Sequence, residues 1–190
     1  MRIAISGTIG SGKSTVSNYL RSLGYVVLSC DEINYELQKF GNEGYYKIIE
    51  SFSNILNDSG EINRQKLASI VFSDENELKK LNDIMHPLIK TKLLEMMSNY
   101  SLVFAEVPLL FETDFYTLFD KNVLIVTNRD IVLKRLIERG LSLEEAKNRI
   151  NNQLDDEIKI SKANEVIYNN GSVEELKSQV DMWLEREVIC

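Results

Sequence analysis

Gly7-Thr-Ile-Gly-Ser-Gly-Lys-Ser14 is the stretch that decides the fold, because it follows the pattern G-x-x-x-x-G-K-[ST]. An apolar run, Ile3-Ala-Ile5, comes just before it and reads as a short buried strand. A helical pattern follows, with apolar residues at positions 16, 19, 20 and 23 on one face. A glycine-rich turn between a strand and a helix is typical of a phosphate-binding loop in an α/β protein.

The residue types in this loop suit a nucleoside triphosphate. Glycines allow backbone N–H groups to converge on phosphate oxygens, and the first turn of the following helix adds further donors. We expect Lys13 to reach the β- and γ-phosphates of ATP and the Ser14 hydroxyl to ligate Mg²⁺. The predicted nucleotide-binding residues of the loop are Gly10, Ser11, Gly12, Lys13, Ser14 and Thr15.

The rest of the chain alternates strand-like and helical segments. A second strand is expected at 25–28, ending at Ser29-Cys-Asp31, and further strands are expected at 102–105, 123–126 and 166–168. Continuous apolar runs of this kind suit strands that helices bury on both faces. The sequence therefore predicts an α/β fold with a parallel sheet built from βαβ units.

Helices are expected between these strands. The interval from 32 to 100 contains no strand-like run and predicts helices at 64–72 and 74–99, the second interrupted at His86-Pro87. Two Ser-x-x-Glu capping boxes predict further helix starts, at Ser142 and Ser172.

The composition argues against several classes of protein. The net charge is −7, which argues against a basic groove for nucleic acid. No apolar run approaches the roughly 20 residues that span a bilayer, so no membrane partner is expected. Cys30 and Cys190 have neither metal-binding nor disulfide spacing, which favours ordinary thiols and a cytoplasmic location.

Two acidic residues come at the ends of predicted strands, on the edge of the sheet where α/β proteins bind their ligands. Asp31 fits two roles: it accepts or orients the proton of an attacking hydroxyl, or it caps a helix that starts at Glu32. Glu106 also fits two roles, a Mg²⁺ ligand beside Ser14 or a solvated charge at a strand end.

Arg135 and Arg139 lie four residues apart on a predicted helix, where like charges are mildly unfavourable. A lid that brings arginines onto the transferred phosphate explains this spacing, and ordinary solvated helix charges are the alternative. The sequence has neither the Asn-Lys-x-Asp nor the Asp-x-x-Gly motif of GTPases. Kinase or ATPase chemistry remains.

Taken together, these segments resemble the dephospho-CoA kinase family, whose members phosphorylate the ribose 3′-hydroxyl of dephospho-CoA. The resemblance runs nearly end to end, and its most specific segments are His86-Pro87 and Val107-Pro-Leu-Leu-Phe-Glu112. The other segments that carry it are 10–15, Asp31, 60–64, 71–72, 81–89, 135–139, 145–146 with Gln153, and 164–170.

The resemblance implies a three-layer fold like that of P-loop nucleoside-triphosphate hydrolases, with a five-stranded parallel sheet. It implies a core of residues 1–31, 101–138 and 164–190, a helical CoA-binding region at 32–100, and a helical lid at 139–163. ATP with Mg²⁺ and dephospho-CoA are the implied small-molecule substrates, and transfer to the alcohol is the last step of coenzyme A biosynthesis.

The resemblance also implies roles for single residues. Asp31 matches the proposed general base of the family, and Lys13 and Arg139 are the other expected catalytic residues. Arg135 is expected to bind the nucleotide. Two other functions stay open at this stage: a nucleoside or nucleotide kinase of the same architecture, and a nucleotide-binding protein without turnover.

The sequence departs from the usual family pattern at four positions around the expected site. Ser29 and Tyr35 stand where the family usually has Asp and Arg, and Glu106 stands where it has Asp. Thr8 replaces a glycine that is common in the loop. These departures bear on substrate affinity and metal geometry.

Overall fold

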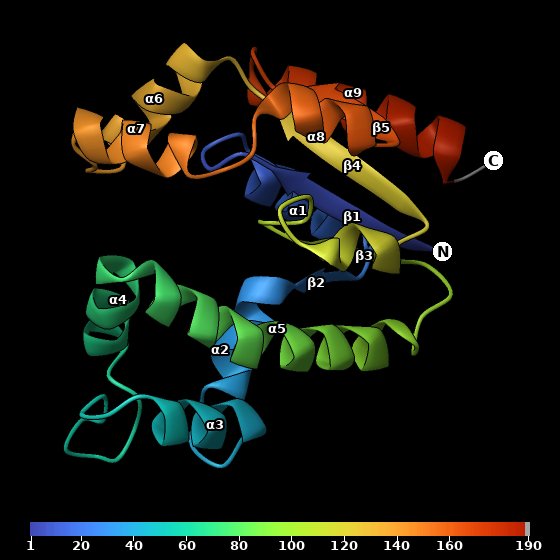
Figure 1. Cartoon of the computed structure of the whole chain (residues 1–190). Helices are drawn as coiled ribbons and strands as arrows, with labels where there is room; N and C mark the ends of the chain where they lie inside the picture. The colour runs from blue at the N-terminus through green and yellow to red at the C-terminus, as the bar shows by residue number, and fades with distance from the viewer. Residues whose placement is uncertain (189–190) are drawn as a thin grey trace. The chain divides into compact units, whose positions relative to one another are not determined.

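The computed structural model describes residues 1–188 and contains a parallel sheet of five strands (Figure 1). The strand order is β2-β3-β1-β4-β5, and each neighbouring pair is parallel. The predicted α/β fold class with a five-stranded parallel sheet is therefore confirmed. The strands are β1 (Arg2–Gly7), β2 (Val27–Ser29), β3 (Val103–Glu106), β4 (Lys121–Val126) and β5 (Glu165–Tyr168).

Both faces of the sheet are buried, as continuous apolar strands require. On one face, side chains of β1, β4 and β5 pack with two helices, α1 (Lys13–Ser22) and α9 (Val173–Glu187). Trp183 of α9 lies edge-on to Phe104 of β3, with ring centroids 6.1 Å apart. Leu124 points to the opposite face and is also fully buried, so that face is covered as well.

The remaining helices of this part of the chain follow β3 and β4. The hydroxyls of Ser142 and Ser172 each accept a hydrogen bond from the backbone N–H of a glutamate three residues on, and the carboxylate of that glutamate accepts a hydrogen bond from the serine N–H. The two predicted capping boxes are therefore confirmed. In the first box, the bond from the Ser142 N–H lowers the pKa of Glu145. The segments are the 3₁₀ helix η1 (Asp114–Leu118), α6 (Arg129–Glu138), α7 (Leu143–Asn151) and α8 (Asp156–Lys162).

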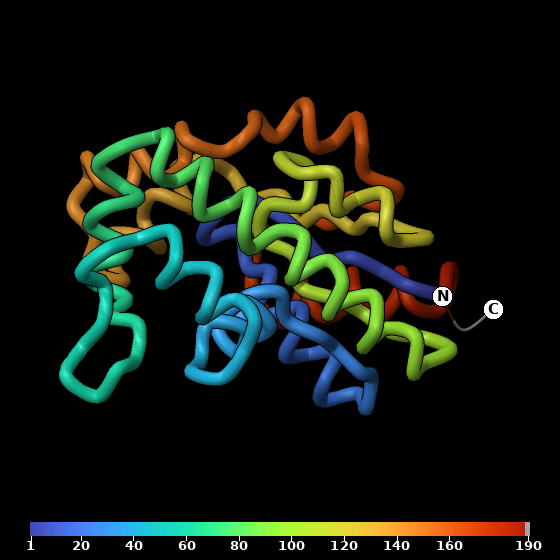
Figure 2. The backbone as a smooth tube through the Cα atoms, turned by 60° about the horizontal axis from the view of Figure 1, so that its bottom comes forward, coloured from blue at the N-terminus to red at the C-terminus, as the bar shows by residue number. Residues whose placement is uncertain are grey.

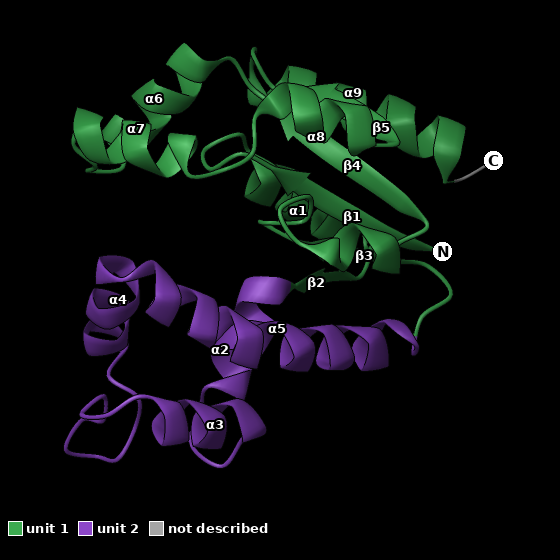
Figure 3. Cartoon of the chain, in the orientation of Figure 1, with its two compact units in different colours: residues 1–29, 100–190 green, residues 30–99 purple. Residues whose placement is uncertain are grey.

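Residues 30–99 form a separate compact unit, and residues 1–29 with the chain from residue 100 onward form the other (Figure 3). The unit of residues 30–99 is one continuous segment of the chain, inserted between β2 and β3 (Figure 2). Its helices are α2 (Cys30–Leu37), α3 (Glu43–Ser51), α4 (Arg64–Ser73) and α5 (Glu75–Met97).

The expectation that Pro87 opens a new helix is wrong, because α5 runs from Glu75 to Met97 as one helix with Pro87 inside it. Proline costs this helix one backbone hydrogen bond, since residue 87 has no N–H to donate to the carbonyl of residue 83. Met85, Ile89, Leu93 and Met97 recur every four residues and are all buried. Burial of this stripe stabilises the continuous helix by more than the missing bond costs.

The second strand begins two residues later than expected, at Val27, and ends at Ser29, where α2 follows it directly from Cys30. Asp31 and Glu32 both lie in the first turn of α2, where the helix dipole favours acidic side chains. Asp31 is therefore not the cap of a helix that starts at Glu32. Cys30 is buried, whereas Cys190 lies outside the described residues. Throughout residues 1–188, each helix is too short or too polar to span a bilayer.

Candidate active site

The loop of residues 7–12 joins β1 to α1 and depends on glycine at two points of close approach. Gly12 has a left-handed backbone (φ +102°), and a Cβ there would lie 2.2 Å from Nδ2 of Asn169. A Cβ on Gly7 would lie 2.4 Å from the carbonyl oxygen of Ile125 in β4. Only glycine therefore lets the loop lie against the ends of β4 and β5.

Side chains from the ends of those two strands hold the loop in place. Asn169 donates from Nδ2 to the carbonyl of Ser11 (2.7 Å), and the Thr127 hydroxyl lies 2.9 Å from the same oxygen. Arg135 of α6 donates to the carbonyl of Gly10 (3.2 Å). These donors engage carbonyl oxygens that would repel a phosphate if they pointed at it.

Thr127 and Asn169 were missed by the sequence reasoning. Each comes directly after an apolar strand, β4 and β5 respectively, and each side chain is buried. The sequence did contain a signal for both residues. Glu106 was selected because it is a polar residue at the carboxyl end of a parallel strand, and the same criterion selects Thr127 and Asn169.

Lys13 is the first residue of α1, and its side chain lies along the loop. Its ammonium donates to the carbonyl of Gly7 (2.8 Å) and lies 3.3 Å from the carbonyl of Thr8. The first turn of α1 offers its backbone N–H groups to an anion at the same place. A positive charge and a helix N-terminus thus converge on the loop.

Ser14 and Glu106, the two predicted metal ligands, lie next to each other. The Ser14 hydroxyl of α1 donates to Oε1 of Glu106, the last residue of β3, over 2.8 Å. Hydroxyl and carboxylate oxygens are the donor types that Mg²⁺ prefers. Residues 1–188 contain no cluster of three or more His, Cys, Asp or Glu that could hold a metal ion.

The two predicted lid arginines are placed differently. Arg135 contacts the loop, whereas Arg139 comes directly after α6 and its side chain is exposed. Gln153 follows α7, which ends at Asn151, and its Oε1 accepts a hydrogen bond from the Ile9 N–H (2.8 Å). The structure thus places Gln153 on the loop, a contact that the sequence reasoning did not foresee.

Asp31 belongs to the unit of residues 30–99, as the second residue of α2. It is exposed and lies two residues beyond Ser29, which ends β2 at the carboxyl edge of the sheet. Its role as general base stays a prediction.

Comparison with known proteins identifies the family. The family model described as dephospho-CoA kinase matches residues 1–175. The chain belongs to the dephospho-CoA kinase family. A dephospho-CoA kinase of Geobacillus kaustophilus is 40% identical over 187 residues, which cover 95% of this chain and 93% of the relative.

Solved structures agree with the match to the dephospho-CoA kinase family. The crystal structure of a Thermus thermophilus protein has a TM-score of 0.84 at 34% identity and covers 99% of this chain and 98% of its own. A dephospho-CoA kinase from Campylobacter jejuni has a TM-score of 0.71 at 32% identity, with 97% of each chain covered.

Two cations of the unit of residues 30–99 lie against Tyr35. Tyr35 of α2 stands where the family usually has arginine, and its exposed ring carries the Arg64 guanidinium 3.8 Å from the ring centroid. The Lys39 ammonium lies 4.9 Å from the same centroid. Cations therefore remain next to position 35, held there by the aromatic face.

Proposed function

We propose that this chain transfers the γ-phosphoryl group of ATP to the ribose 3′-hydroxyl of dephospho-CoA. The observation that carries the proposal is the match to the dephospho-CoA kinase family over residues 1–175. The loop, Lys13 and the adjacent Ser14–Glu106 pair support it, because phosphoryl transfer needs positioned phosphates and neutralised charge more than covalent chemistry. The cytoplasmic location stays a prediction.

In the proposed reaction, the loop N–H groups and Lys13 bind the β- and γ-phosphates and stabilise the charge that develops on them. Ser14 and Glu106 would hold Mg²⁺, which neutralises charge between these phosphates. Arg135 keeps the loop in its binding conformation. Asp31 accepts the proton of the attacking hydroxyl, and Arg139 acts on the transferred phosphate.

The test is a coupled assay of ADP release with ATP and Mg²⁺, in which dephospho-CoA is compared with a panel of nucleosides and nucleotides. We expect turnover with dephospho-CoA to exceed turnover with every member of the panel. Preference for a nucleoside would assign the chain to another class of kinase. ATP binding without turnover on any acceptor would make it a nucleotide-binding protein.

Glu106→Gln is expected to raise the Mg²⁺ concentration for half-maximal activity by roughly tenfold or more, because a neutral amide replaces the carboxylate beside Ser14. The melting temperature should change little, since the pair is exposed. Activity titrated against Mg²⁺ measures the effect, with Glu138→Gln on the exposed surface of α6 as control. An unchanged Mg²⁺ dependence would remove Glu106 from the metal site.

Arg139→Ala is expected to lower kcat at least about tenfold with little change in melting temperature, because an exposed arginine contributes little to folding. Lys134→Ala is the matched control, a cation of α6 with 77% of its side chain exposed. A melting temperature several degrees lower with kcat unchanged would show that Arg139 has a structural role.

A further inference from the structure

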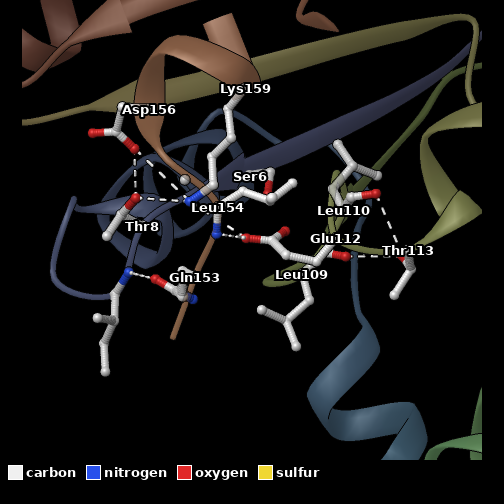
Figure 4. A network of polar contacts seen from close by, with 12 residues as sticks. Ser6, Thr8, Leu109, Leu110, Glu112, Thr113, Gln153, Leu154, Asp156 and Lys159 are labelled. Atoms are coloured by element: carbon white, nitrogen blue, oxygen red, sulfur yellow. Dashed lines mark hydrogen bonds and ion pairs between the residues drawn. The ribbon is translucent and has the colours of Figure 1, made fainter. Parts of the chain in front are cut away.

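Lys159 of α8 is a buried cation for which the proposed mechanism has no use. Its side chain is only 2% exposed. An ammonium group removed from water is unfavourable unless it is paired and hydrogen-bonded. Its Nζ lies 2.9 Å from Oγ1 of Thr8, 3.4 Å from Oε1 of Glu112 and 3.8 Å from Oδ1 of Asp156 (Figure 4).

These contacts join three segments that are far apart in the sequence. Thr8 belongs to the phosphate-binding loop, Glu112 to the turn after β3, and Asp156 to the first turn of α8. The Thr8 hydroxyl accepts a hydrogen bond from the Lys159 ammonium and donates one to Oδ1 of Asp156 (2.6 Å). The Thr8 side chain therefore bridges the ammonium and the carboxylate of the Lys159–Asp156 ion pair. Glu112 accepts a second bond, from the Leu154 N–H (3.2 Å).

The same cluster has an excess of negative charge beside a loop that is proposed to bind phosphates. It contains two carboxylates and one ammonium group. The Glu112 side chain is 16% exposed, and its Oε2 is buried with no hydrogen-bond partner among the described residues. Without Lys159, both carboxylates would be uncompensated next to Thr8 and would repel the phosphates of a nucleotide.

The packing of the loop differs between neighbouring residues: Ile9 packs against the cluster that contains Val132, whereas Thr8 borders a cavity. A cavity of about 180 Å³ lies beside Thr8 and Asp156, and Val132 and Leu154 also line it. An open space next to a loop leaves its position to directional contacts, here the bonds made by the Thr8 hydroxyl. Thr8 thus gives the loop a polar side chain where the family commonly has glycine.

We propose that Lys159 is a positioning residue for nucleotide binding. Its ammonium ties the loop at Thr8 to the start of α8 and to the turn at Glu112, and it neutralises the carboxylates beside the loop. The inference rests on the proposed nucleotide site, because it concerns the conformation in which that loop receives phosphates.

The test compares ADP binding by Lys159→Met and by the wild-type chain, with Mg²⁺, by titration calorimetry well below the melting temperature. We expect the dissociation constant for ADP to rise at least about tenfold in the folded variant, the scale for loss of a charge-assisted contact. Lys162→Met, an exposed lysine on the same helix, is the matched control and should bind ADP as the wild type does.

Two further variants separate positioning from folding. Lys159→Met combined with Glu112→Gln should recover part of the lost ADP affinity, because it removes one uncompensated carboxylate. Should Lys159→Met fail to fold, Thr8→Val removes the connecting hydroxyl with little change of shape, and its ADP affinity should fall about threefold or more. The inference is overturned if a folded Lys159→Met chain binds ADP within about twofold of wild type. If that variant does not fold, the same result for Thr8→Val overturns it.

The outcome is distinguishable from failure of the proposed function. ADP binding needs no acceptor, so a wild-type chain that binds ADP but does not phosphorylate dephospho-CoA overturns the proposed function alone. Normal turnover on dephospho-CoA with unchanged ADP binding by Lys159→Met overturns the positioning role alone.

Discussion

Lys13→Ala is expected to lower kcat/KM for ATP by about two to three orders of magnitude, while the chain stays folded. The Lys13 ammonium lies over the loop, bonded to the Gly7 carbonyl. Negative charge spreads over the β- and γ-phosphates in the transition state. A fixed cation therefore stabilises the transition state more than it stabilises the ground state. Steady-state rates with dephospho-CoA, beside circular dichroism spectra, measure the effect.

The control for Lys13→Ala is Lys134→Ala on α6, whose side chain is 77% exposed and pairs with Glu138 one turn along the same helix. This variant should keep wild-type rates. Turnover by folded Lys13→Ala within about tenfold of wild type would contradict the assignment of Lys13 to the phosphates.

The sheet and the loop could be predicted because their signals are local. Val103-Phe-Ala105 in β3 and Val123-Leu-Ile-Val126 in β4 are continuous apolar runs, and the loop motif lies within eight residues. The two capping boxes depend on residues only three apart. Each of these patterns favours one local backbone conformation without depending on residues that are distant in the sequence.

The supports of the loop could not be predicted in the same way. Lys159 and Thr8 are 151 residues apart, and Asn169 and Ser11 are 158 apart. Nothing in the local sequence of α8 indicates that one of its lysines is buried, because lysines on short charged helices are usually exposed. Only the folded sheet brings these partners together.

Two helix boundaries also differ from what local signals predict. Proline predicts a break within the 74–99 pattern, yet a buried stripe at four-residue spacing keeps α5 continuous. Asp and Glu after a strand predict a cap and then a helix, yet α2 begins one residue before Asp31. Helix boundaries shift by a residue or two when the first turn has alternative ways to satisfy its N–H groups.

Asp31→Asn is expected to lower kcat with dephospho-CoA roughly a hundredfold or more and to leave ATP binding normal. The substitution keeps the size and most of the hydrogen bonding of the side chain but removes its ability to accept a proton. A general base contributes on this scale because the attacking hydroxyl must lose its proton as phosphoryl transfer proceeds. The measurements are kcat for both chains and their dissociation constants for ATP.

The position of Asp31 in the first turn of α2 supplies a matched control. Asn in place of Asp also weakens the interaction with the helix dipole, which costs about 0.3–1 kcal/mol of stability. Glu32→Gln removes a charge from the same turn without touching the proposed base, so it should reproduce any loss of melting temperature and keep wild-type kcat. Equal and small effects of both variants on kcat would remove Asp31 from the mechanism. Glu106 would then be the remaining candidate for the base, because it is the carboxylate that ends β3 beside Ser14.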